Sequence, residues 1–197
     1  MKYTSEIITE RLLKFRSVCI EVTSDYNTYN LLFNENNREI LTSFAPIFFN
    51  DLARILHRDW LLQVSKMFDP PETVTGGYSS ENLTFDLIKS DLLVISDRNR
   101  DEYEAAERAM EKAKKIKPYI QVVRNKLLAH NDLRTKFSNE FIGAFPDGIL
   151  NDFLIGMQEF CDSAGRLTGD DPLCFKSSSG PGDVLDFLKR MRISHRQ

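Results

Sequence analysis

The sequence predicts an all-α fold, an up-and-down helical bundle of four to five helices. Apolar residues recur every three or four positions in several long segments, which is the period of a helix with one buried face. No segment shows the sustained apolar–polar alternation of a strand, and no internal repeat of about 20–50 residues is evident. These observations favour one packed domain built from helices.

The composition is that of a globular protein without an overall attraction to nucleic acid. The 197 residues are 42% hydrophobic and 28% charged, with a formal net charge of -3. A chain with this charge does not attract polyanions as a whole, so RNA binding would need a local basic patch.

The cysteines and the first residues predict a cytoplasmic protein. The three cysteines lack CxxC spacing, which argues against a disulfide framework and against a zinc site. Glu6, Glu10 and Arg11 interrupt the apolar residues at the start, so a signal peptide is not expected. No apolar stretch approaches the roughly 18 residues of a membrane span. We expect no membrane segment, cofactor or metal.

The first half of the chain predicts two long helices and a shorter one. Residues 5–22 carry one apolar stripe, formed by Ile8, Leu12, Phe15, Cys19 and Val22. After an Asn-rich interlude a second, central helix is expected to run to about Phe68, with Pro46 near its start or at a kink. Residues 70–80, with Gly76 and Gly77 at the tip, are interpreted as a solvated turn, and residues 83–95 as a short helix.

Residues 100–131 predict one long helix. Its stripe consists of Ala105, Ala109, Ala113, Ile116, Ile120, Val123 and Leu127. The stripe continues across Pro118 without a slip, which favours a kink over two separate helices.

The rest of the chain predicts another helix over residues 149–167, with Asp147 as its cap, and a short last helix. We therefore divide the chain into a helical domain at residues 1–168, a linker at 169–182, and a short helix with a basic tail at 183–197. The tail is interpreted as a frayed terminus rather than a nucleic-acid site. Its basic residues are Lys189, Arg190, Arg192, His195 and Arg196.

Four polar residues gather at the end of the long, otherwise apolar helix: Arg124, Asn125, His130 and Asp132. This phrase resembles the signature of the HEPN superfamily, an Arg followed by Asn, Asp or His and then, after a few residues, by a His near the end of a core helix. Ala129 before the His and Asp132 after it are most similar to the abortive-infection AbiU-like branch. The resemblance covers residues 1 to about 165 and implies an HEPN-like bundle whose long kinked helix carries the motif.

The resemblance implies a ribonuclease that works without metal. His130 would act as general acid or base, because an imidazole titrates near neutrality. Arg124 would hold the scissile phosphate and stabilise charge on its oxygens while the RNA 2′-hydroxyl attacks. Asn125 would position the phosphate or ribose, and Asp132 would orient the imidazole. The context implied is phage defence or a toxin–antitoxin pair.

The resemblance also implies a homodimer. On a straight helix Arg124 and His130 lie about 120° apart around the axis and roughly 9 Å apart along it, so they need a helix end or a second chain to meet. One HEPN pattern has a Tyr two residues after the His as the target of a nucleotidyl-transferring antitoxin. Asp132 stands there instead, which argues against that control, and Tyr119 is the alternative target.

Several structural interpretations compete with these roles. His130 continues the apolar stripe and fits a hydrogen-bonded core histidine, while Arg124 fits an interfacial ion pair. His57 is a second candidate for a basic pocket, but a polar helix face accounts for it. Trp60, Phe48 and Phe49 suit base stacking, but aromatic residues at helical spacing are usually core.

The leading hypothesis is an RNA-cleaving effector, with RNA, a second copy and an antitoxin or regulatory protein as partners. The alternative is a non-catalytic HEPN-like module that binds a nucleotide or a protein. A purely structural helical dimer is the third.

Overall fold

The computed structural model describes residues 4–125, 145–175 and 182–195, and over these residues the chain is mostly helical, as predicted. The only sheet among them is a two-stranded hairpin. The helices are α1 (Ser5–Phe33), α2 (Glu35–Phe44), α3 (Pro46–Lys66), α4 (Phe85–Val94), α5 (Arg100–Lys114), α6 (Lys117–Val123), α8 (Ile149–Thr168) and α9 (Val184–His195), with a 3-10 turn at Ser96–Arg98.

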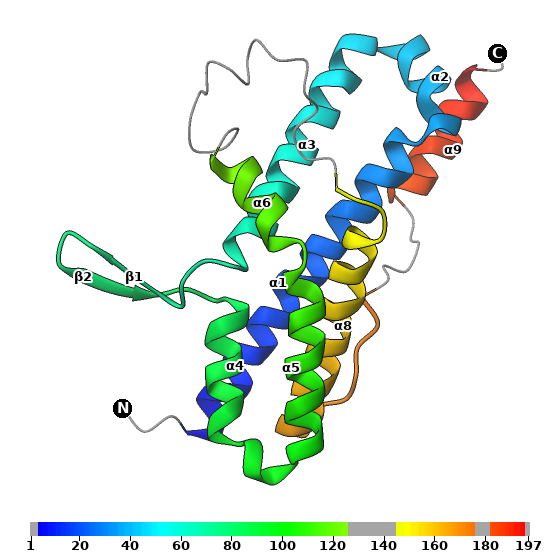
Figure 1. Cartoon of the computed structure of the whole chain (residues 1–197). Coiled ribbons are helices and arrows are strands. Elements are labelled where there is room, and N and C mark those ends of the chain that lie inside the picture. Colours follow the sequence, from blue (N-terminus) through cyan, green and yellow to red (C-terminus); the bar gives the residue numbers. More distant parts are fainter. Residues whose placement is uncertain (1–3, 126–144, 176–181, 196–197) are drawn as a thin grey trace.

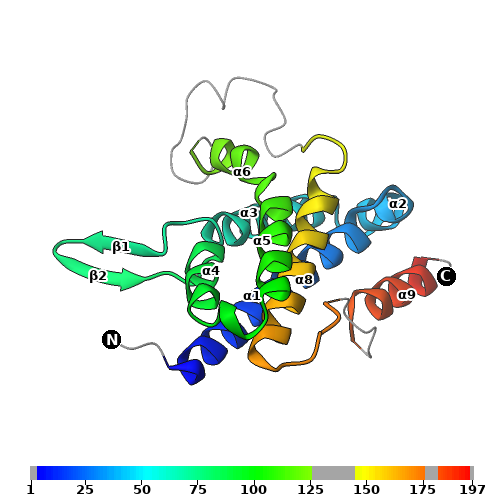
Figure 2. The ribbon, with the colours of Figure 1, turned by 60° about the horizontal axis from the view of Figure 1, so that its bottom comes forward.

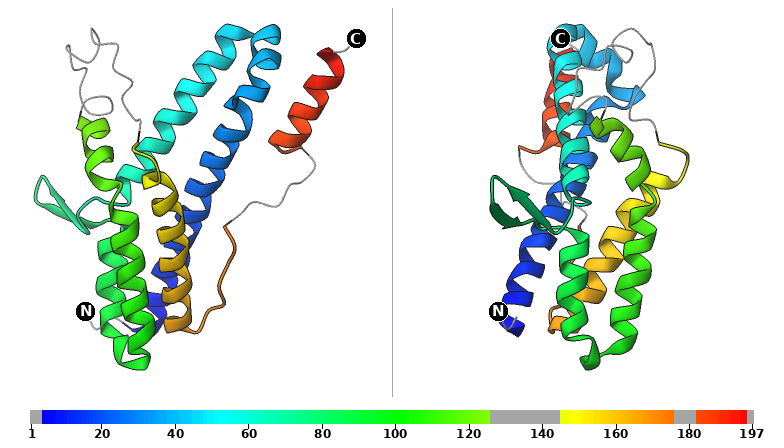
Figure 3. Two further views of the ribbon diagram at one scale, coloured as in Figure 1. Left: turned by 45° about the vertical axis from the view of Figure 1, so that its right-hand side comes forward. Right: turned by 60° about the vertical axis from the view of Figure 1, so that its left-hand side comes forward.

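The first half of α1 stands in a bundle with α4, α5 and α8, and α3 enters the bundle at its C-terminal end (Figures 1 and 2). The second half of α1 leaves the bundle alongside α3, and α2 and α9 lie at that far end. The start of α1 and the end of α9 are therefore at opposite ends of the molecule (Figure 3).

The larger group of buried apolar residues, here called the main core, joins α1, the end of α3, α4, α5, α6 and α8. Phe15, Phe85 and Phe160 meet at its centre with ring centroids 5.0–5.9 Å apart. The backbones of α5 and α8 approach closely at Gly156, where an added Cβ would lie 2.7 Å from the carbonyl oxygen of Ala109. A glycine is therefore required at this crossing.

A smaller group, here called the outer core, lies at the far end of the molecule. It consists of Leu32, Leu41, Phe49, Leu188 and Met191, which come from α1, α2, α3 and α9. Apolar side chains around it stay exposed, among them Phe44, Ile47 and Phe48.

Helix α1 extends to Phe33 and not only to Val22, because Tyr26, Tyr29 and Phe33 continue the helical spacing through the Asn-rich interlude. The expected second helix is α3, which begins at Pro46, so the predicted position of this proline near a helix start is confirmed, whereas α2 was not predicted as a separate helix. The break falls at Ala45, whose φ is -158°, because the residue before Pro46 is pushed out of the helical region.

Residues 70–80 are not a simple turn, and the expectation that no strand forms is wrong here. Glu72–Thr75 and Tyr78–Glu81 pair as antiparallel strands β1 and β2, with Thr75 opposite Tyr78. Gly76 and Gly77 form the two-residue turn with positive φ values of 60° and 84°. The hairpin projects from the bundle with all of its residues exposed (Figure 1). Its strands therefore lack the buried face that alternation would have revealed.

The single kinked helix expected over residues 100–131 is corrected to two helices, α5 and α6, over its described part. The amides of Lys115 and Ile116 bond to the third carbonyl before them and not to the fourth. Pro118 causes the break, since it has no amide hydrogen and its ring clashes with the fourth carbonyl before it. It lies in the first turn of α6.

Helix α8 begins after Gly148, whose φ is 82°, and not after a cap at Asp147. The described part of the expected linker, residues 169–175, packs on the bundle. There the buried Arg16 donates to the carbonyl of Asp171 at 2.7 Å, and Phe175 is buried.

The last helix reaches His195 and takes up most of the basic tail, so the interpretation as a frayed terminus is wrong for this part. Asp183 caps it by accepting a hydrogen bond from the amide of Asp186 at 2.9 Å. Leu188 and Met191 are buried in the outer core, and Arg192 donates to Asn37 at 2.7 Å. Among the described residues, no helix is long and apolar enough to cross a membrane.

Candidate functional site

Arg124 lies at the C-terminal end of α6. Its backbone is still helical, with φ -54° and ψ -50°, and its amide donates to the carbonyls of Ile120 and Gln121. The two preceding turns of α6 are anchored in the main core by Ile120 and Val123. The Arg124 side chain is 48% exposed, so its guanidinium is reachable from solvent. Asn125 follows it and is exposed as well.

The Arg124 guanidinium forms an ion pair with Asp69, which follows the C-terminal end of α3. Asp69 is 21% exposed and Arg124 is 48% exposed, so the pair is partly shielded from water. A guanidinium carries five N–H donors in a planar fork, and a carboxylate occupies only some of them. Guanidinium donors that a carboxylate leaves unused are able to bind an oxyanion such as a phosphate.

The segment that carries Asp69 is held on both sides. Before it, the carbonyl of Met67 accepts a hydrogen bond from the amide of Phe85 at 3.1 Å. After it, the carbonyl of Pro70 accepts one from the Asn82 side chain at 2.8 Å. Asp69 is thus fixed by the start of α4 and by the base of the hairpin. It in turn limits the positions that the Arg124 side chain can take.

Asp69 is the site residue that sequence reasoning missed. It ends the second predicted helix, but nothing in the local pattern links it to Arg124, because the two are 55 positions apart. The interpretation of Arg124 as an ion-pair partner is confirmed by this contact. The contact leaves half of the side chain accessible, so it does not exclude a functional role.

The other two predicted site residues, His130 and Asp132, lie outside the described residues. Leu127, the last residue of the predicted stripe, does so too. Whether the imidazole meets the guanidinium of Arg124 therefore remains a prediction, as does the alternative of a core histidine.

The remaining candidate residues, three aromatic side chains and His57, differ in how deeply they are buried. Trp60 is buried at 3% exposure and its indole N–H donates to the carbonyl of Val22 at 3.0 Å, so it is a core residue. Phe49 is buried in the outer core, whereas Phe48 is exposed. His57 is half-buried and packs against Tyr29 with ring centroids 5.4 Å apart. Burial lowers the pKa of His57, so the imidazole is neutral at pH 7.

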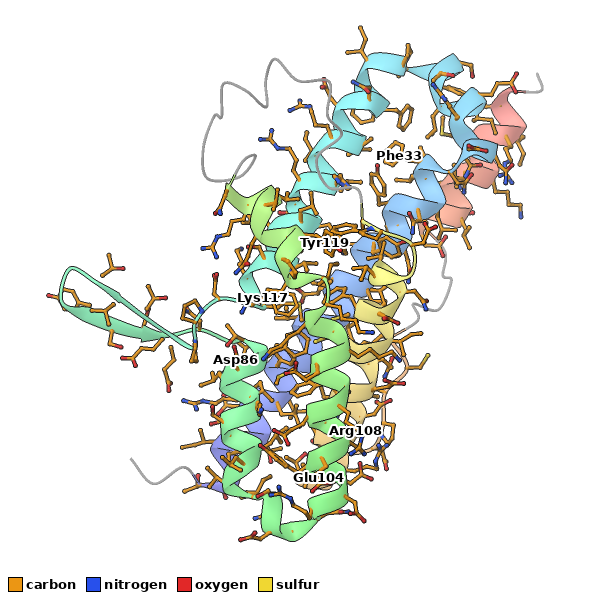
Figure 4. All side chains as sticks on the ribbon, viewed as in Figure 1. Phe33, Asp86, Glu104, Arg108, Lys117 and Tyr119 are labelled. Atoms are coloured by element: carbon orange, nitrogen blue, oxygen red, sulfur yellow. The ribbon has the colours of Figure 1, made fainter. Side chains whose placement is uncertain are left out.

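Tyr119, the alternative target of modification, lies on α6. Figure 4 shows it between α6 and the start of α8, and its ring centroid is 6.5 Å from that of Phe145. It is 36% exposed and no described contact links it to Arg124. Within the described residues, no group of three or more His, Cys, Asp or Glu side chains is arranged to hold a metal ion.

Comparison with known proteins identifies the family. Residues 7–189 match the family model HEPN_AbiU2, described as AbiU2. No curated protein and no solved structure shows significant similarity to the chain. Because the match covers most of the chain, the chain belongs to the AbiU2 family of HEPN proteins and is an HEPN module of the abortive-infection type.

Proposed function

We propose that this member of the AbiU2 family is a metal-independent endoribonuclease that acts in the cytoplasm as an effector of phage defence or of a toxin–antitoxin pair. The observation that carries the proposal is the position and solvent exposure of the Arg124 side chain. Its guanidinium lies at a helix end, is half exposed, and among the described residues is paired with Asp69 through one nitrogen, Nη1. An oriented cation that solvent can reach suits the binding of a phosphodiester.

The proposed reaction needs only an imidazole and a guanidinium. His130, when neutral, removes the proton of the RNA 2′-hydroxyl, and the 2′-oxygen attacks the adjacent phosphorus. Arg124 stabilises the negative charge that builds up on the phosphate oxygens. The bond to the 5′-oxygen breaks, and a protonated imidazole returns a proton to that oxygen. The products are a 2′,3′-cyclic phosphate and a 5′-hydroxyl end.

The main test is cleavage of RNA by the purified protein in EDTA, read as fragments with 2′,3′-cyclic phosphate ends. We expect cleavage by the native chain and none by His130→Ala or Arg124→Ala. Arg100→Ala is the matched control, because Arg100 is also an exposed arginine in an ion pair, with Glu104. Equal activity of the native chain and the folded His130→Ala variant would refute the assignment. RNA left intact by the native chain would favour the non-catalytic alternative.

The role of Asp69 has its own test. If Asp69 positions Arg124, Asp69→Asn should lower the cleavage rate by about 10–100-fold, because small misplacements of catalytic groups have effects of this size. The melting temperature should change little, and Asp69→Glu should recover part of the rate. A rate that falls only in proportion to lost folded protein would make the contact merely structural.

We propose that the active form is a homodimer in which two motifs share one cleft. The position of Arg124 at a helix end supports this, since a second copy can bring its His130 to the same phosphate. Mixing the inactive Arg124→Ala and His130→Ala variants should restore cleavage, because a mixed dimer keeps one intact Arg124 and one intact His130. If exchanged mixed dimers stay inactive, the shared cleft is wrong.

A further inference from the structure

Exposed apolar side chains gather at the far end of the molecule, where α2 meets α3. Residues 44–48 are here called the apolar corner. Ile47 is 79% exposed, Phe48 60% and Phe44 45%. Residues 40–50 contain no charged side chain, so the apolar corner lies within an uncharged stretch. Figure 1 shows the turn from α2 into α3 at one extreme of the fold. Large apolar side chains that are exposed together in this way mark a contact surface.

Several polar groups of the apolar corner and of the turn before it are already satisfied within the chain. Pro46 has no amide hydrogen, and the amide of Ala45 donates to the carbonyl of Leu41 at 3.2 Å. The hydroxyls of Thr42 and Ser43 donate to carbonyls of their own helix at 2.9 Å and 2.8 Å. A polar group that has a partner costs less to remove from water than one that loses its only partner. These groups therefore oppose the transfer of the corner out of water only weakly.

Helix α9 brings positive charge to the same end of the molecule. It carries Lys189, Arg190 and Arg192 against one acidic residue, Asp186. Lys189 is exposed, and the side chain of Arg190 is 78% exposed. Arg192 donates to Asn37 at 2.7 Å and so holds the last turns of α9 against α2. Figure 3 shows the C-terminal end of α9 and the turn from α2 into α3 at the same end of the molecule. A surface that meets this end therefore meets apolar side chains and cations together.

We propose that this end of the molecule binds the surface of a membrane that contains anionic lipids. Phe44, Ile47 and Phe48 enter the boundary between headgroups and acyl chains, and the cations of α9 face the headgroups. The exposed side chains lie around the ends of two helices and not along one helix face, so they do not form the stripe that a partner helix would match. A bilayer accepts protruding side chains without a shaped pocket. The contact is peripheral and does not depend on the cleavage motif.

The test is co-sedimentation of the full chain with vesicles of phosphatidylcholine, or of an equal mixture of phosphatidylcholine and phosphatidylglycerol. We expect binding to the mixed vesicles that is about fivefold tighter for each cation at the surface than binding to phosphatidylcholine alone. Phe48→Ser should weaken binding to the mixed vesicles about tenfold or more, because it removes the inserted ring. Val74→Ser is the matched control, since Val74 is 69% exposed on the hairpin, and it should bind as the native chain does.

Two further variants locate the contact. In Phe48→Trp, brominated lipid should quench the new tryptophan, whereas the buried Trp60 of the native chain should keep its fluorescence. Lys189→Gln combined with Arg190→Gln should weaken binding to the mixed vesicles only. These changes leave Arg192 and its bond to Asn37 in place.

Three results would overturn the proposal. The first is native chain that does not sediment with the mixed vesicles. The second is equal binding by the native chain and by Phe48→Ser that has a native-like melting temperature. The third is a lipid-free dimer, seen by analytical ultracentrifugation, that Phe48→Ser dissociates, because a second copy would then cover the apolar corner.

Discussion

The main core and the outer core are both built from apolar helix faces, but they bury these faces to different extents. In the main core Leu12, Phe15 and Met110 have no exposed surface at all. In the outer core every member keeps 3–8% of its surface exposed, and Phe48 nearby is 60% exposed. The difference shows that the chain has one tightly packed bundle and one lightly covered extension, with α1 and α3 passing through both.

The largest effect should come from the centre of the main core. Phe15→Ala removes a ring that touches both Phe85 and Phe160, so it should lower the free energy of unfolding by about 3–5 kcal/mol. Urea denaturation followed by circular dichroism measures it. Phe48→Ala removes an equal number of atoms at an exposed position and should change the same free energy by less than about 0.5 kcal/mol. A similar loss in the free energy of unfolding for both variants would show that the two regions do not differ in packing.

Gly156→Ala tests the contact between α5 and α8. Its methyl group would lie 2.7 Å from backbone atoms of both Ala109 and Ala113, and helix backbones cannot yield as a flexible side chain can. We expect a loss of about 1–3 kcal/mol in the free energy of unfolding, the range for overpacked cores. Gly77→Ala has space around its Cβ and tests only the positive φ of the turn. A native-like melting temperature for Gly156→Ala would show that the helices move apart easily.

Leu188→Ala tests whether the outer core opens on its own. The change should cost about 2 kcal/mol, the lower end for a buried leucine, because the neighbouring apolar residues are already partly exposed. Hydrogen exchange should speed up in α9 and α2 while the amides of α5 and α8 keep their protection. Equal acceleration in all four helices would mean that the two cores unfold together.

The smallest expected effect is a pH dependence from His57, which lies between the two cores. Burial lowers its pKa below the ordinary 6.5, so below about pH 6.5 the unfolded chain binds a proton that the folded chain resists. The stability that the neutral His57 imidazole contributes is fully present above about pH 6.5 and is lost as the pH falls through the lowered pKa of the folded chain. The slope should be smaller in His57→Leu, measured by urea denaturation over this pH range. An identical slope would contradict the assignment.

The helices with one regular stripe were predictable, and those with a local interruption were not. The spacing of Ile8, Leu12 and Phe15 identifies α1, and the same rule finds α4 and α8. It fails at Pro118, because the apolar phase continues across a break that the missing amide hydrogen imposes. It also misses the hairpin, since Glu72–Thr75 and Tyr78–Glu81 bury neither face and so show no alternation.

For the candidate site, the sequence supplied the residues of the motif but not their surroundings. Arg124 stands out because it is charged and ends an apolar helix. Its partner Asp69 does not stand out, because an acidic residue at a helix end is common and the contact exists only in three dimensions.

Helix α3 connects the outer core to the candidate site. It begins in the outer core with Phe49, continues through the main core with Leu61 and Val64, and delivers Asp69 to Arg124 just beyond its end. Because α3 is one continuous helix, a change of its tilt at the outer core would also move Asp69 relative to the guanidinium of Arg124. A protein bound to α2 and α9 would therefore be able to shift Asp69 without contacting Arg124.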